Sequence, residues 1–180
     1  MEALNLNLTL DRLKGPTTAQ LISCMQWAAT GLDRFHQNSE AEMEILIDGE
    51  QRNIKLSWDS NFSKAAMKED VDIANHGGVA LAWFLMSVLL DYGYVEQTEI
   101  GDGVDYRFMK SEPDDDNLNF LDEHHYVEIS GILRETKSNT LAGRIKTKHV
   151  QVNRGRMKDY SSSVIISLFS APKTVKEIHK

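Results

Sequence analysis

The segment HYVEISGIL, residues 125–133, decides the fold. Its β-branched and apolar residues predict a buried strand. The segment SSSVIISLFS, residues 161–170, is uniformly apolar and predicts a second strand in the middle of a sheet. Glu128 lies at the centre of the first strand, where a carboxylate is costly unless it is paired, protonated or bound to a metal. The sequence should therefore contain a partner for Glu128.

The segments around these two strands predict a mixed sheet. Residues 63–93 read as a long helical stretch, and residues 94–110 read as two strands joined by a glycine-rich turn. Residues 138–154 predict another helix before the strand at 161–170. This helix-strand-strand-strand-helix-strand order predicts an α/β (α+β) fold, with a mixed central sheet flanked by helices.

The first third of the chain predicts an addition to this core. Residues 17–35 have apolar residues at helical spacing, and residues 41–58 alternate on both sides of Asp48-Gly49, which indicates a β-hairpin. We therefore expect residues 1–62 to form a helix and hairpin extension packed on a core of residues 63–180, in one globular unit. The extension could lengthen the sheet, cover the long apolar helix or form a dimer surface.

Composition excludes several classes of protein. Cys24 is the sole cysteine among 180 residues, so neither an intrachain disulfide nor a cysteine-based zinc site can form. The longest apolar run, residues 79–90, is shorter than the ~20 residues that span a bilayer. No basic start followed by an apolar block marks a signal peptide, so we expect a cytoplasmic protein without a membrane partner.

The charge distribution indicates a local basic surface. The net charge of −7 argues against general coating of nucleic acid. Residues 134–158 nevertheless carry eight Lys or Arg residues against one Glu. Such an asymmetry favours a basic patch on one helix.

Asp105 is the expected partner of Glu128. It lies in GDGVDYRF, residues 101–108, after a turn with two glycines. Consecutive strands of a meander are neighbours, so facing side chains have Cβ atoms about 5 Å apart. Two carboxylates this close repel each other unless a cation lies between them. The pair therefore predicts a Mg²⁺ or Mn²⁺ site with Asp105 and Glu128 as ligands.

The following helix supplies positive charge. Helical geometry places Lys148 beside the buried stripe, with Arg144 and Gln151 on the same side and Lys146 on the opposite face. Arg144, Lys148 and Gln151 could therefore line one edge of the two acids. Such a group would hold a scissile phosphate or neutralise its developing charge.

The spaced pattern GVDY…VEISG…GRIKTKHVQ, within residues 103–151, resembles the PD-(D/E)xK nuclease superfamily. It is most similar to an uncharacterised bacterial group with the pattern GTG-x-DY…(L/V)EVSGI…RVKQK-x-x-Q, and the resemblance covers about residues 70–172. The resemblance implies that Asp105 is the first metal-binding acid and Glu128 the second.

The chain departs from the superfamily at two places. Ser130 stands where most members have Lys, although some members move the basic residue to the following helix. Many members also have an acid on the first core helix, where this chain has His76, with Asp72 one turn earlier.

The leading hypothesis is a metal-dependent nuclease-like protein that hydrolyses phosphodiester bonds in DNA or RNA. Lys148, with Arg144 or Lys146 as alternates, would stabilise the developing charge, and Gln151 would orient the water or the phosphate. The alternative is a catalytically degenerate member of the same fold. It would act as a protein-interaction or regulatory subunit, in a bacterial defence or toxin system. A homodimer fits the nuclease hypothesis, since many such nucleases cut two strands as dimers.

Overall fold

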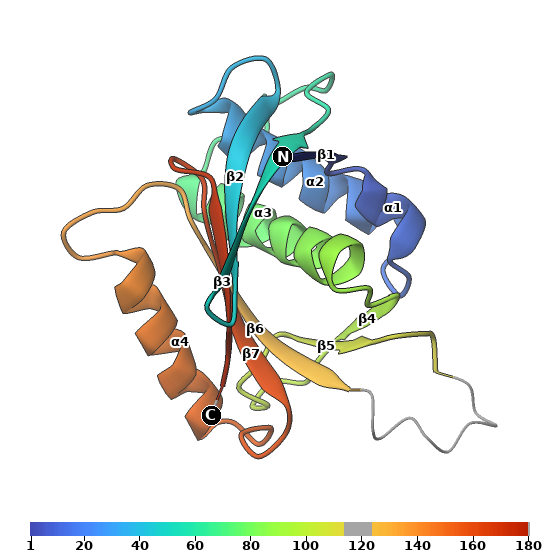
Figure 1. Cartoon of the computed structure of the whole chain (residues 1–180), viewed down its shortest axis with the longest axis vertical. Coiled ribbons are helices and arrows are strands. Elements are labelled where there is room, and N and C mark those ends of the chain that lie inside the picture. The colour runs from blue at the N-terminus through green and yellow to red at the C-terminus, as the bar shows by residue number, and fades with distance from the viewer. Residues whose placement is uncertain (114–123, 180) are drawn as a thin grey trace.

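The computed structural model describes residues 1–113 and 124–179, which form one eight-stranded mixed sheet with helices on both faces (Figure 1). The strands are β1 (Glu2–Asn5), β2 (Glu40–Ile47), β3 (Glu50–Ser57), β4 (Tyr94–Gln97), β5 (Tyr106–Met109), β6 (His125–Ile132), β7 (Ser162–Leu168) and β8 (Lys173–Ile178). The helices are α1 (Leu8–Arg12), α2 (Thr18–Asp33), α3 (Asp70–Phe84) with a π-helical continuation η1 (Leu85–Leu89), and α4 (Leu141–Arg154). The predicted fold class, a mixed sheet flanked by helices, is confirmed.

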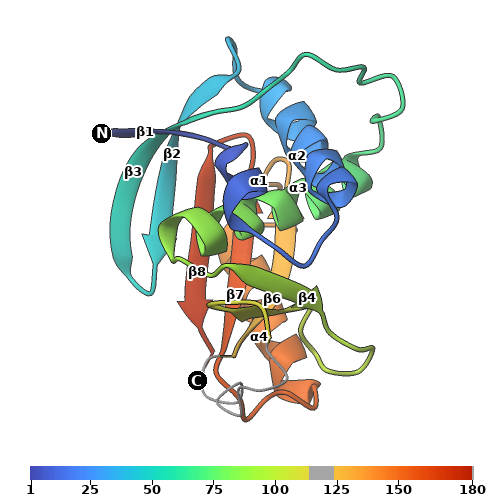
Figure 2. The same cartoon turned by 90° about the vertical axis from the view of Figure 1, so that its right-hand side faces the viewer.

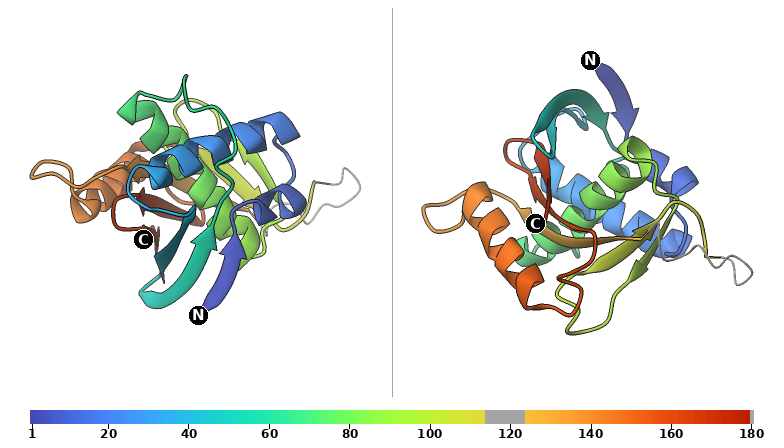
Figure 3. Two further views of the ribbon diagram at one scale, coloured as in Figure 1. Left: turned by 90° about the horizontal axis from the view of Figure 1, so that it is seen from above. Right: turned by 60° about the horizontal axis from the view of Figure 1, so that its bottom comes forward.

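The sheet has the strand order β1-β3-β2-β8-β7-β6-β5-β4. Strands β4, β5 and β6 are antiparallel neighbours, and β6 is parallel to β7. A parallel pair needs a crossover connection, and α4 provides it. Helices α2 and α3 cover one face of the sheet while α4 covers the other (Figure 2). Figure 3 shows the same separation from two further directions.

The N-terminal segment is built into this sheet. Strands β2 and β3 form the predicted hairpin, and both Asp48 and Gly49 in its turn have positive φ. β2 also pairs in parallel with β8, so the hairpin lengthens the core sheet. Helix α2 packs along α3. The extension therefore has two of its three expected roles. It lengthens the sheet, and it covers the long helix.

The strand β8 is a feature that the sequence reading missed. The sequence predicts 161–170 as the last strand, but the residues after Pro172 return antiparallel to β7. The segment has few apolar residues, so it gives a weak local signal. Its place is fixed by neighbours on both sides, β7 and β2.

Helix α3 is the central helix of the fold. It starts at Asp70 rather than at residue 63 and continues through Gly77-Gly78 without a break. A Cβ on Gly78 would lie 2.8 Å from the amide nitrogen of Gly131, and one on Gly131 would lie 1.9 Å from the carbonyl oxygen of Ala74. The glycines therefore let α3 approach β6, the strand that carries Glu128, at backbone contact.

The stretch Asp70–Leu89 is long and apolar enough to cross a membrane by length and composition. In the fold, 67% of the most apolar 18-residue window in this stretch is buried. Its apolar side chains pack against the sheet and α2. This is the environment of a core helix.

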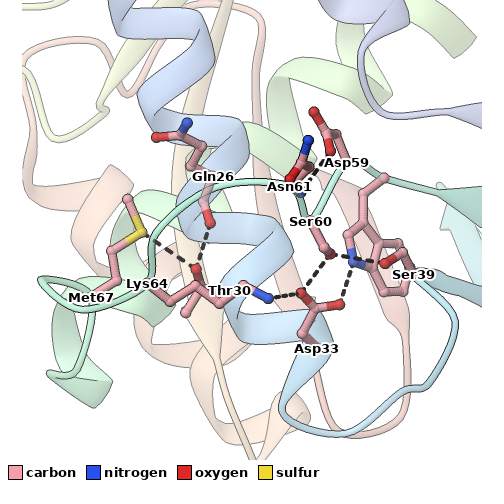
Figure 4. Close-up of polar contacts among 10 residues, drawn as sticks. Gln26, Thr30, Asp33, Ser39, Asp59, Ser60, Asn61, Lys64 and Met67 are labelled. Carbon is pink, nitrogen blue, oxygen red and sulfur yellow. Dashed lines mark hydrogen bonds and ion pairs between the residues drawn. The ribbon is translucent and has the colours of Figure 1, made fainter.

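The connection between the hairpin and α3 is held by Asp33 at the end of α2 (Figure 4). Asp33 accepts hydrogen bonds from Trp58 Nε1 at 2.7 Å and Ser60 Oγ at 2.6 Å, and it forms an ion pair with Lys64. Partial burial of Asp33 opposes ionisation, but these donors outweigh it and lower the pKa of the carboxyl. One carboxylate thus anchors the connecting chain to α2.

Candidate functional site

Asp105 and Glu128 lie side by side, Asp105 just before β5 and Glu128 on the neighbouring strand β6. The β5–β6 register pairs Tyr106 with Val127, so Asp105, the residue before β5, lies beside Glu128. The amide of Asp105 donates to the carbonyl oxygen of Val127 at 2.9 Å. Asp105 Oδ2 in turn accepts from the amide of Ile129 at 2.7 Å. Backbone contacts with β6 therefore fix the Asp105 carboxylate next to the second acid.

Glu128 is completely buried on the α4 face of β6. Its Oε1 atom forms an ion pair with Lys148 and accepts a hydrogen bond from Gln151 Nε2 at 2.7 Å. Lys148 also donates to Gln151 Oε1 at 3.2 Å. The other oxygen, Oε2, has no hydrogen-bond partner within residues 1–113 and 124–179. One oxygen of this acid is thus held by α4, while the other is buried without a donor among the described residues.

The two acids are electrostatically strained. Burial and the adjacent charge of Asp105 raise the pKa of Glu128 to about 7, although Lys148 acts in the opposite direction. Burial likewise raises the pKa of Asp105 above its ordinary value, against the Ile129 hydrogen bond and the charge of Lys148. The pair would be relieved by a proton or by a further positive charge.

Of the three basic residues proposed for this site, Lys148 contacts an acid. The Arg144 guanidinium instead donates to Asn139 Oδ1 at 2.8 Å and to Ser130 Oγ at 3.4 Å. Arg144 therefore lies next to Ser130 on β6. Lys146 is exposed on the far side of α4, because two residues turn a helix by about 200°. The structure does not bring Lys146 to the acids.

The helix α4 begins slightly later than expected. Its cap is Thr140, whose hydroxyl accepts from the amide of Gly143 at 3.1 Å, so the helix starts at Leu141 rather than at residue 138. The start of the helix sets which of its residues face the sheet. Arg144, Lys148 and Gln151 are three and four residues apart, so they share one face.

The first core helix contributes no ligand to this pair. His76 is exposed and packs against Trp27 of α2, with ring centroids 5.6 Å apart, and Asp72 is exposed in the first turn of α3. Within the part of the chain that the structure describes, no three His, Cys, Asp or Glu residues gather at metal-binding distance. A cation at this site would have Asp105 and Glu128 as its protein carboxylates.

A pocket of about 420 Å³ opens beside Asp105. The turn between β4 and β5, residues 97–105, lines one wall. The end of α4 lines the other with Gln151, Arg154 and Gly155. The pocket gives solvent and ligands a path to Asp105, while Glu128 lies behind Lys148 and Gln151.

The two walls meet through glycines. A Cβ on Gly155 would lie 2.1 Å from the carbonyl oxygen of Asp102, and one on Gly103 would lie 2.6 Å from Cα of Gly155. The backbones are therefore in direct contact, and no side chain fits between them. Arg154, next to this contact, was not singled out from the sequence, although it belongs to the basic run at 134–158. Its place on the pocket wall depends on where α4 ends.

None of the family models, curated proteins or solved structures compared with this chain matches it. The resemblance to the PD-(D/E)xK superfamily stays a prediction, and the interpretation of the site rests on its geometry.

Proposed function

We propose that this protein is a cytoplasmic, metal-dependent phosphodiesterase that cleaves nucleic acid. The observation that carries this proposal is the convergence of four side chains from three elements. Asp105 directly precedes β5 and Glu128 lies on the adjacent β6, while Lys148 and Gln151 reach Glu128 from α4. Paired carboxylates with an adjacent ammonium match the needs of phosphate chemistry, in which a cation and a positioned positive charge stabilise the transition state.

The two acids fit a divalent cation. Mg²⁺ is commonly bound by one or two carboxylates together with waters and substrate phosphates, so a third protein ligand is not required. Glu128 Oε2 is a buried oxygen without a partner among the described residues, and Asp105 is next to it. When bound, such an ion polarises a phosphate oxygen and lowers the pKa of a water molecule.

The chain itself supplies positioning and charge. Lys148 is 18% exposed, so its ammonium could turn from Glu128 towards a phosphate bound beside the two acids. Gln151 lines the pocket and can orient a water or a phosphate oxygen with its amide. The backbone of Ile129 keeps Asp105 in place throughout, because its amide donates to Oδ2.

The second candidate is a degenerate member of the same fold that acts as a regulatory or protein-interaction subunit, in a bacterial defence or toxin system. The ion pair between Lys148 and Glu128 favours it, because the chain neutralises its own buried acid without a metal. Ser130 in place of a lysine on β6 is consistent with this candidate.

Cleavage of supercoiled plasmid DNA and of a structured RNA, with Mg²⁺, Mn²⁺ or EDTA, tests the proposal. Asp105→Asn keeps the acceptor for the Ile129 amide and should abolish metal-dependent cleavage. Lys148→Met should reduce it strongly, while Lys146→Met, on the other face of α4, should cleave like the parent. Parental activity in Asp105→Asn would show that the proposal is wrong.

A metal titration of thermal stability separates the two candidates. Binding of Mn²⁺ to the folded state should stabilise the parent by about 2.7 kcal/mol at a hundredfold excess over Kd. Asp105→Asn and Glu128→Gln should lose this gain. Identical melting of the parent in Mn²⁺ and in EDTA would favour the regulatory candidate.

A further inference from the structure

The turn between β4 and β5 is a fixed wall of the pocket. Arg156 Nε donates to Asp102 Oδ1 at 3.0 Å, and its terminal nitrogen donates to the carbonyl oxygen of Ile100 at 3.2 Å. Asp102 is buried and also accepts, through Oδ2, from the amide of Glu99 at 3.0 Å. The turn is thus tied both internally and to Arg156, two residues after the end of α4.

This turn presents an apolar side chain to solvent. Ile100 is 101% exposed and lines the pocket that contains Asp105. A single exposed apolar residue is ordinary on a protein surface. At this place it is held on a rigid support at the rim of the site, where a bound ligand would meet it. The face of a base or of a sugar ring in nucleic acid could pack against such an apolar side chain.

Arg154 faces the same pocket from the end of α4. It is exposed, and its guanidinium has no hydrogen bond or ion pair with any residue in the described ranges. The neighbouring Arg156 differs, because it is paired with Asp102 at 2.9 Å. A free guanidinium beside a site for phosphate chemistry is suited to bind a phosphate with two hydrogen bonds.

We propose that the pocket wall formed by the β4–β5 turn and the end of α4 is the nucleic-acid-binding surface of this protein. Arg154 binds a backbone phosphate next to the one at Asp105, and Ile100 packs against a base or sugar of the same strand. The inference rests on the proposed function for its ligand class, a phosphodiester strand. It adds two binding residues, Arg154 and Ile100. Both lie outside the cluster formed by the two acids with Lys148 and Gln151.

Binding measured without cleavage tests this inference. The full chain is titrated into a fluorescein-labelled DNA duplex, its single strand and an RNA strand, with EDTA present, and anisotropy is recorded over a range of salt. Arg154→Ala should weaken binding several-fold and reduce the slope of log K against log salt by about 0.9 for a duplex or 0.7 for a single strand. Ile100→Ser should weaken binding several-fold and leave the slope unchanged, since it removes no charge.

Two matched controls accompany these variants. Lys146→Ala removes one charge from the other face of α4, and Ile22→Ser removes an exposed apolar residue from α2, on the opposite side of the sheet. Both should bind like the parent. Equal losses in the controls, parental binding by Arg154→Ala and Ile100→Ser, or no binding by the parent would overturn the inference. Binding that depends on Arg154 and Ile100 in a protein that cleaves nothing would support the inference while removing the proposed activity.

Discussion

Lys148 on α4 and Glu128 on β6 form an ion pair in which the carboxylate is fully buried and the ammonium is partly exposed. The pair is asymmetric, because the Glu128 side chain is fully buried in the sheet while the Lys148 side chain is 18% exposed. Gln151 bridges the two side chains, since it donates to Glu128 and accepts from Lys148. The acid at this site therefore comes from β6, and α4 supplies both the positive charge and the amide that contact it.

Glu128 should reduce the stability of the metal-free protein above neutral pH. Its pKa is raised from 4.5 to about 7, mainly by burial. The folded state binds the Glu128 proton more tightly than the unfolded state does. The stability contributed by the protonated side chain is therefore fully present below pH 4.5 and is lost as pH rises through 7. In EDTA at pH 8, Glu128→Gln should therefore be more stable than the parent, by up to about 3 kcal/mol.

Urea unfolding at pH 5 and pH 8 measures this difference. The gain of Glu128→Gln should be smaller at pH 5, and the exposed substitution Glu50→Gln should show no such pH dependence. A variant less stable than the parent at pH 8 would mean that the Lys148 ion pair outweighs the burial of Glu128.

His125 should make the fold sensitive to acid. Its ring is buried between Ser161 Oγ at 3.0 Å and Ser163 Oγ at 2.8 Å, and burial lowers its pKa to about 4. The unfolded chain binds this proton more tightly, so stability is full above pH 6.5 and falls between pH 6.5 and 4, by about 3 kcal/mol.

Denaturant midpoints across this range check the effect. His125→Asn should flatten the profile between pH 6.5 and 4, while His76→Asn, at an exposed position on α3, should follow the parent. The assignment fails when the parent and His125→Asn lose stability in parallel.

Gly155→Ala should displace the β4–β5 turn. The new methyl group would lie 2.1 Å from the carbonyl oxygen of Asp102, a backbone atom that cannot turn aside. We expect a loss of about 3 kcal/mol in unfolding free energy and a strong loss of nucleic-acid binding. Gly143→Ala is the control, because its methyl group would meet the hydroxyl of Thr140 at 3.0 Å, and it should change stability by less than about 1 kcal/mol. If Gly155→Ala were as thermally stable as the parent, the backbone of Gly155 would not lie in close contact with Asp102.

Asp33→Asn should loosen the connection between the hairpin and α3. The substitution removes the ion pair with Lys64 and weakens acceptance from Trp58 and Ser60, at a cost of about 1–3 kcal/mol. Since the pKa of Asp33 is lowered, its contribution is present above the unfolded pKa and is lost as pH falls below it. Chemical denaturation at pH 7 measures the cost, and Asp59→Asn, with one local hydrogen bond, should differ little from the parent. If Asp33→Asn had the same denaturation midpoint as the parent, Asp33 would not anchor the connection.

Local pattern determined most of the elements of this protein. The apolar runs around Glu128 and at 161–170 could form only buried strands, and Asp48-Gly49 marked the hairpin turn because both residues tolerate positive φ. The order of helices and strands then required α4 to cross over between β6 and β7. The proximity of Asp105 to Glu128 also followed from the sequence, because consecutive antiparallel strands pair as neighbours.

Tertiary packing decided what the pattern left open. The polar segment of β8 became a strand because β7 and β2 provide hydrogen-bonding edges on both sides of it. Lys148, rather than Arg144 or Lys146, reached Glu128 because the Thr140 cap of α4 and the packing of the helix on the sheet fix its rotation. Arg154 and Ile100 came to one pocket because Gly103 and Gly155 allow two backbones to touch. Periodicity along a chain reports which face of an element is buried, whereas the contacts between elements depend on distances that no local segment contains.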